Sequence, residues 1–136
     1  MEIKSQEQRA IANEDDIQSV TTTVKRVTAL LNFSFLNQTK LVTAASELAR
    51  NTLEHGKGGQ SLIQVLNDRD RVGIRIIFED DGPGIPDVEK ALSDGFTTGK
   101  GMGLGLGGAK RLMDEFLIEA KQPGTKITVM KWLDKN

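Results

Sequence analysis

The chain is poor in the residues that build several common kinds of functional site. Its 136 residues include no cysteine, no tyrosine, one histidine and one tryptophan. The lack of cysteine excludes a disulfide framework, a thiolate metal site and a cysteine nucleophile. No apolar run approaches the length of about 20 residues that spans a membrane, and the polar first eight residues do not resemble a signal peptide. We therefore expect a cytoplasmic protein.

Charge of one sign is not in excess either. Eighteen Lys and Arg residues balance nineteen Asp and Glu residues, for a formal net charge of -1. This balance, without a basic stripe, argues against a nucleic-acid partner. The length is that of one domain with a core of its own. We expect a single globular domain over residues 1–136 that binds neither nucleic acid nor membrane.

Glycine, in contrast, is abundant, and half of it lies in one stretch. Seven of the fourteen glycines fall within residues 95–108. Such a cluster costs backbone entropy, and its usual purpose is to bring backbone N–H groups and a helix N-terminus close to an anion. Gly103-x-Gly105-x-x-Gly108 fits the dinucleotide fingerprint, but no strand leads directly into it, and no complete P-loop is present. We interpret the stretch as a loop over nucleotide phosphates.

Apolar periodicity predicts the elements around this loop. Helical stripes cover residues 17–31 and 41–53, with Asn13 and Asn37 as predicted N-caps. A short helix is expected at residues 86–92, and a further helix is expected from the glycine stretch to about residue 115. Strands are predicted at residues 3–12, as an edge strand, and at residues 62–66, 72–78, 116–120 and 126–132. This order predicts an α+β fold, a two-layer sandwich whose mixed, mostly antiparallel sheet has helices on one face.

Two further groups of residues could carry chemistry. Glu47 and Asn51 are four positions apart, so they share one face of a helix whose neighbours are small and apolar. A carboxylate beside an amide oxygen suits Mg²⁺ or a base next to a metal ligand, although a solvated polar face is the simpler alternative. Asp80-x-Gly82-x-Gly84 follows a buried strand and would let the backbone approach a flat ligand, although a plain Pro-Gly turn has the same composition.

The three groups in this order resemble the GHKL (Bergerat-fold) ATP-binding domain. Glu47-x-x-x-Asn51 is similar to its N-box, Asp80-x-Gly82-x-Gly84 to its G1 box and residues 101–106 to its G2 box. The resemblance covers essentially the whole chain. Within the superfamily, the chain resembles the bacterial anti-sigma-factor serine kinases, and most of all the switch kinase of the stressosome.

This resemblance implies ATP and Mg²⁺ as cofactors and a role for each motif residue. Glu47 would be the general base or would orient the attacking hydroxyl, and Asn51 would bind both the nucleotide and Mg²⁺. Asp80 would accept the adenine amino group, with Gly82 and Gly84 permitting its approach. The remaining implied contacts come from a hydroxyl and from backbone amides, at Thr98, Gly101, Gly103 and Gly105. His55 is interpreted as a structural or capping residue.

The same resemblance implies partners and leaves more than one function open. A protein serine/threonine kinase of this family would phosphorylate STAS-domain antagonists and then act on a PP2C-type phosphatase or a sigma factor. The alternative is a nucleotide-gated module that sequesters an anti-sigma pathway partner without phosphorylating it. A free-standing ATPase is disfavoured, because the sequence shows no transducer domain.

Overall fold

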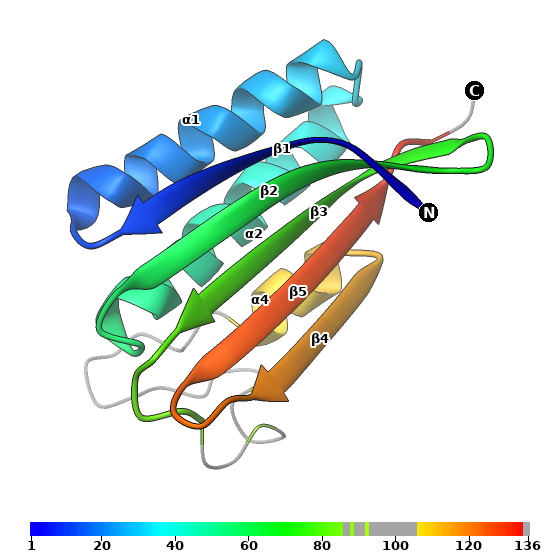
Figure 1. Ribbon diagram of the computed structural model, residues 1–136. Helices are drawn as coiled ribbons and strands as arrows, with labels where there is room; N and C mark the ends of the chain where they lie inside the picture. Colours follow the sequence, from blue (N-terminus) through cyan, green and yellow to red (C-terminus); the bar gives the residue numbers. More distant parts are fainter. Residues whose placement is uncertain (86–87, 89–91, 93–105, 135–136) are drawn as a thin grey trace.

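The chain folds into one sheet and one layer of helices (Figure 1). In the computed structural model, the described residues are 1–85, 88, 92 and 106–134. The strands are β1 (Glu2–Ile11), β2 (Gly59–Asp68), β3 (Arg71–Asp80), β4 (Glu115–Ala120) and β5 (Thr125–Trp132). The helices are α1 (Glu14–Leu30), α2 (Phe35–Glu54) and α4 (Leu106–Leu112). No helix within these ranges is long and apolar enough to cross a membrane.

The sheet has the strand order β1-β2-β3-β5-β4, and every described pairing is antiparallel. The helices α1, α2 and α4 cover the same face (Figure 1). Residues of β3 that alternate toward the helices, Ile74, Ile76 and Phe78, are fully buried, because they meet Leu48 and Ala45 of α2 in one core. The predicted α+β two-layer sandwich is confirmed, with β1 as the predicted edge strand.

The helix starts follow from side-chain caps. Asn13 accepts a hydrogen bond from the Asp16 amide at 3.0 Å, as predicted for the first helix. The predicted N-cap of the second helix is wrong. Ser34 is the cap, its Oγ accepting from the Asn37 amide at 3.1 Å, and Asn37 lies inside α2. The buried apolar stripe begins only at Leu41, so apolar periodicity could not indicate that the helix already begins at the exposed Phe35.

The helix predicted after the glycine stretch is too long by about one turn. It ends at Leu112, and residue 115 already belongs to β4. The buried Lys131 of β5 donates to the Leu112 carbonyl at 3.1 Å, and Asp114 accepts from the Trp132 amide at 2.8 Å. These contacts from a neighbouring strand stop the helix. β2 and β3 are in turn longer than predicted, because their register continues to Asp68 and Arg71.

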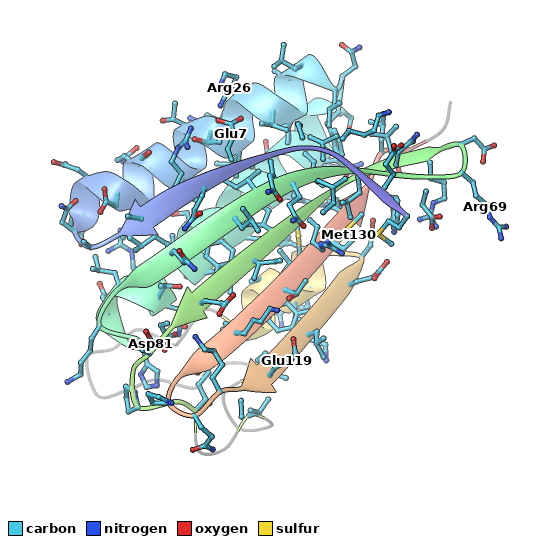
Figure 2. All side chains as sticks on the ribbon, in the orientation of Figure 1. Glu7, Arg26, Arg69, Asp81, Glu119 and Met130 are labelled. Carbon is cyan, nitrogen blue, oxygen red and sulfur yellow. The ribbon has the colours of Figure 1, made fainter. Side chains whose placement is uncertain are left out.

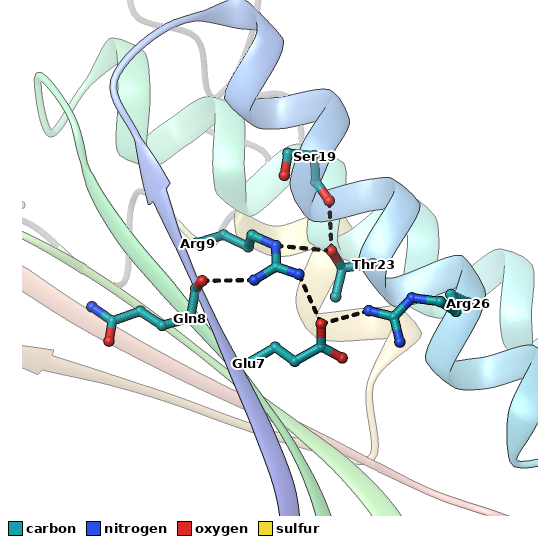
Figure 3. Close-up of polar contacts among 6 residues, drawn as sticks. All are labelled: Glu7, Gln8, Arg9, Ser19, Thr23 and Arg26. Atoms are coloured by element: carbon teal, nitrogen blue, oxygen red, sulfur yellow. Dashed lines mark hydrogen bonds and ion pairs between the residues drawn. The ribbon is translucent and has the colours of Figure 1, made fainter.

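A polar network fastens the edge strand to the helical layer (Figure 3). Glu7 of β1 accepts from Arg9 at 2.7 Å and from Arg26 of α1. Arg9 also donates to Thr23 Oγ1 at 3.2 Å. The hydrogen bond from Arg26, followed by the charges of both arginines, lowers the pKa of Glu7. β1 is thus held on one side by β2 and on its helix-facing side by charge-assisted hydrogen bonds.

Candidate functional site

The carboxylate of Asp80 lies where β3 ends beneath the C-terminus of α2. Only 7% of Asp80 is exposed, and its Oδ1 accepts a hydrogen bond from the Gly82 amide at 3.0 Å. Gly56 follows α2 so closely that a methyl group there would lie 2.5 Å from Asp80 Oδ2. The chain therefore needs glycine at position 56 to bring the helix end over this carboxylate.

The loop after β3 packs against the same helix end. A methyl group at Gly82 would lie 2.6 Å from the Gly56 carbonyl oxygen and 2.8 Å from its Cα. Gly84 adopts a φ of 79°, which favours glycine, and its carbonyl lies 3.2 Å from His55 Nε2. His55 is also the C-cap residue of α2, in agreement with its predicted structural role. The structure thus brings Asp80, Gly82 and Gly84 together at one helix end.

The turn between β4 and β5 closes Asp80 from the other side. The buried Thr125 is the register partner of Asp80 on β5. A methyl group at Gly124 would lie 2.8 Å from the Asp80 carbonyl carbon, and its φ is 104°. Lys121 donates to the Asp80 carbonyl at 3.3 Å and pairs with Asp81 at 3.1 Å. The hydrogen bond to Asp81 comes first among the interactions that raise the pKa of Lys121.

A pocket of about 410 Å³ opens between these two segments. One wall is the loop from Gly82 to Ile85, and the other is the end of β4 with the turn up to Thr125. Figure 2 shows Asp81 at the end of β3 and Glu119 on β4. The volume lies in the range of small-molecule sites. Asp80 does not line this pocket and instead lines a neighbouring hollow of about 310 Å³, together with Lys121. A larger hollow of about 600 Å³, beside Arg71 and Trp132, contains none of the predicted site residues.

Glu47 and Asn51 lie on α2, one turn apart, as predicted. Glu47 is exposed, whereas Asn51 is 6% exposed and lies in the last turn of the helix. The Asn51 carbonyl accepts from the amides of His55 and Gly56, at 2.9 and 3.1 Å, which ties it to the helix end above Asp80. A reactive carboxylate at position 47 would therefore be open to a substrate, while the amide of Asn51 is set deeper.

Four predicted nucleotide contacts lie outside the described residues. They are Thr98, Gly101, Gly103 and Gly105. Of the predicted helix at residues 86–92, only Val88 and Leu92 are described, and both are helical.

Sequence reasoning missed four residues around Asp80. They are Gly56, Lys121, Gly124 and Thr125. In the sequence, Gly56 is typical of a helix end and Gly124 of a turn, but neither pattern indicates that Gly56 lies against the Asp80 carboxylate or that Gly124 lies against the Asp80 main chain. The only signal in the sequence is a glycine after a helix and a glycine before a strand, and it does not identify the residue that each glycine contacts.

Comparison with known proteins agrees with this geometry. Residues 36–135 match the family described as histidine kinase-, DNA gyrase B-, and HSP90-like ATPase. The chain is 44% identical over 124 residues to the serine/threonine-protein kinase RsbT of Bacillus subtilis, covering 90% of this chain and 93% of that protein. It is 33% identical over 101 residues to an anti-sigma F factor of Clostridium novyi, covering 70% and 71%.

Solved structures show the same fold at low identity. One holds the RsbU and RsbW domains of a Mycobacterium tuberculosis protein, with a TM-score of 0.66 and 19% identity over 98% of this chain and 34% of that chain. Another is the SiaB–SiaC complex from Pseudomonas aeruginosa, with a TM-score of 0.57 and 11% identity over 96% and 91%. The matched family over residues 36–135 and the 44% identity to RsbT confirm the prediction made from the motifs: the chain belongs to the histidine kinase-, DNA gyrase B- and HSP90-like ATPases.

Proposed function

We propose that the protein is an ATP-dependent serine/threonine protein kinase that phosphorylates STAS-domain antagonists in a bacterial partner-switching pathway. The observation that carries the proposal is the buried Asp80 carboxylate, which lies against Gly56 and accepts the Gly82 amide, while Gly124 packs against the Asp80 main chain. The 44% identity to RsbT over nearly both full lengths supports the kinase activity. A PP2C-type phosphatase or a sigma factor would be the downstream partner.

In this proposal Asp80 selects the base of the nucleotide. Its Oδ1 already accepts the Gly82 amide, which orients the carboxylate. A carboxylate retains further lone pairs, so it can accept the exocyclic amine of adenine. The keto group of guanine at the same place would offer no proton, and buried acceptors left facing each other are costly. The backbone amides of Gly101, Gly103 and Gly105, with Thr98, would contact the phosphates.

Asn51 would hold Mg²⁺ together with the phosphate oxygens. The described residues contain no group of three or more His, Asp or Glu side chains that could hold a metal ion. A Mg²⁺ here fits the usual pattern of few protein ligands, water and nucleotide phosphates, and an amide oxygen suits it. When bound, the ion supplies positive charge to the phosphates.

Glu47 would act on the protein substrate. Its exposed carboxylate accepts the proton of a Ser or Thr hydroxyl while the hydroxyl oxygen bonds to the γ-phosphorus and the bond from that phosphorus to the ADP oxygen breaks. Exposure is consistent with a base that must meet a side chain delivered by another protein. The phosphoryl group would pass directly to the substrate hydroxyl without a covalent enzyme intermediate, so Glu47 would contribute only positioning and proton transfer.

The test is phosphate transfer from labelled ATP to a purified STAS-domain protein encoded by a neighbouring gene. Glu47→Gln removes the base without changing shape, and we expect kcat to fall by about 10²–10⁴-fold with ATP binding retained. Glu54→Gln is the matched control, because Glu54 is exposed on the same helix and pairs with Arg50 at 3.2 Å. Transfer at the normal rate by the Glu47→Gln protein would refute the assignment of the base.

The second candidate is a nucleotide-gated binding module. The 33% identity to an anti-sigma F factor favours this possibility. It predicts a stable complex with a sigma factor that forms with ATP and yields no phosphorylated product. Size-exclusion chromatography of the mixture, followed by intact mass measurement of each partner, separates the two functions.

A further inference from the structure

The turn that joins α1 to α2 carries an unusual group of exposed apolar side chains. Leu30, Phe35 and Leu36 are 71%, 83% and 63% exposed. They make up three of the seven large hydrophobic residues that are exposed in the described part of the chain, and they lie within seven positions. We name these three residues the corner patch. Single exposed apolar residues are ordinary, whereas a local group marks an interaction surface.

The corner patch occupies a place where helices usually carry acids. The first turn of α2 contains no acidic residue, and Phe35 and Leu36 directly follow the cap Ser34. Acidic side chains in that turn would be stabilised by the positive end of the helix dipole. Their replacement by two exposed hydrophobic residues gives up this stabilisation, so the packing of the chain alone does not account for the choice.

The surroundings of the patch are basic. Residues 17–46 contain Lys25, Arg26 and Lys40 but no Asp or Glu, although the whole chain has a net charge of -1. Lys25 and Lys40 make no ion pair with any residue that the structure describes, and Arg26 pairs with Glu7. Asp134 also reaches this end of the molecule, where it accepts a hydrogen bond from the side-chain amide of Asn37 at 2.8 Å.

The patch lies far from the nucleotide pocket. α2 has 20 residues, so its ends are about 30 Å apart at 1.5 Å per residue. Asp80 lies beneath its C-terminus, whereas the patch lies at its N-terminus and at the end of α1 (Figure 1). A protein bound here would leave the pocket and Glu47 uncovered.

We propose that the corner patch binds a partner protein through an amphipathic segment that combines apolar and acidic side chains. The apolar face would cover Phe35 and Leu36, and the acids would meet Lys25, Lys40 and the helix N-terminus. A second copy of this chain fits poorly, because a two-fold contact would bring like charges together. A membrane also fits poorly, because stable anchoring takes more than one short apolar group.

The test uses three synthetic helical peptides against the isotope-labelled protein. One has a leucine face and glutamates elsewhere, the second has lysines in place of the glutamates, and the third is a scrambled form of the first. We expect the acidic peptide to shift amide resonances of residues 25–40 and the other two peptides to have no effect there. Equal binding of the lysine peptide, or shifts confined to other elements, would overturn the proposal.

Matched variants locate the binding. Phe35→Ser with Leu36→Ser should weaken the acidic peptide at least tenfold while leaving ATP affinity unchanged, whereas Leu117→Ser on β4, also 55% exposed, should not weaken it. Equal loss in both variants would overturn the proposal. Two other results would also overturn the proposal. One is co-sedimentation of the protein with anionic vesicles, and the other is dimer formation in sedimentation equilibrium, in each case lost in the Phe35/Leu36 variant. If the Phe35/Leu36 variant still binds ATP with unchanged affinity, its loss of peptide binding says nothing against the proposed kinase activity.

Discussion

Gly82→Ala tests the packing that builds the nucleotide pocket. The added Cβ would lie 2.8 Å from the Gly56 Cα and 2.6 Å from its carbonyl oxygen. Both obstructing atoms are backbone, so no rotamer change relieves the contact. The loop that begins at Gly82 must instead move away from the end of α2.

The size of the movement follows from the distance. Carbon atoms in contact are about 3.5 Å apart, so the loop has to shift by about 0.7 Å. Overpacking of this kind costs about 1–3 kcal/mol. The shift would also stretch the 3.2 Å contact between His55 Nε2 and the Gly84 carbonyl and pull the Gly82 amide from Asp80. Binding of ATP has to reverse the displacement, and each 1.4 kcal/mol is tenfold in affinity.

We therefore expect Gly82→Ala to lower the free energy of unfolding by about 1–3 kcal/mol and to weaken ATP binding about tenfold. Urea unfolding followed by circular dichroism gives the first quantity, and isothermal titration gives the second. Gly108→Ala is the control. Gly108 is in α4, and among the described residues outside its own helix backbone no atom lies within 4 Å of its would-be Cβ, so alanine there should stabilise the protein by about 0.5–1 kcal/mol.

The two alanine variants must differ in sign for the reasoning to hold. If Gly82→Ala unfolds at the same urea concentration as the unchanged protein and binds ATP equally well, the close approach of the loop to α2 is not part of the site. If Gly108→Ala destabilises as much as Gly82→Ala, the effect belongs to glycine replacement in general.

Two further predictions concern parts of the sheet outside the pocket. Because Arg26 holds the pKa of Glu7 below its ordinary value, the stabilisation by Glu7 is complete above about pH 4.5 and is lost as the pH falls through the lowered pKa. The difference in unfolding free energy between the unchanged protein and Glu7→Gln should therefore shrink on acidification below that pH; a constant difference from pH 7 to pH 3 would contradict this. Arg71 Cζ lies 3.8 Å from the ring centroid of Trp132, the only tryptophan, so Arg71→Ala should cost about 0.5–1 kcal/mol and shift the fluorescence emission to longer wavelength. Arg71→Lys should recover part of both effects, and an unshifted spectrum in Arg71→Ala would show that the stacking does not shield the indole.

Local patterns predicted the fold well where burial is periodic. The strand and helix order, the Asn13 cap and the edge position of β1 could all be predicted, because alternation and helical stripes report which face is buried. The start of α2 could not, because Phe35 and Leu36 are apolar yet exposed. The end of α4 could not either, since it depends on Lys131, a residue of a strand that follows it in sequence.

The candidate site shows the same division between local and distant information. Asp80, Gly82 and Gly84 form one short motif, and the structure places them together. The positions of Gly56 and Gly124 against Asp80 arise only when α2 and the β4–β5 turn pack on the end of β3. Such contacts between segments far apart in the sequence leave no period or motif to detect.

The glycines outside the dense stretch explain the pocket in a way that the stretch itself does not. Three segments of the chain converge on Asp80, and each contributes a glycine where a methyl group would meet the carboxylate, its backbone or the adjoining helix end. A plain turn after β3 would require a glycine in that turn alone, not at the end of α2 as well. In the proposed site, glycine at these positions is what lets the backbone lie close to the buried acid and to a flat ligand beside it.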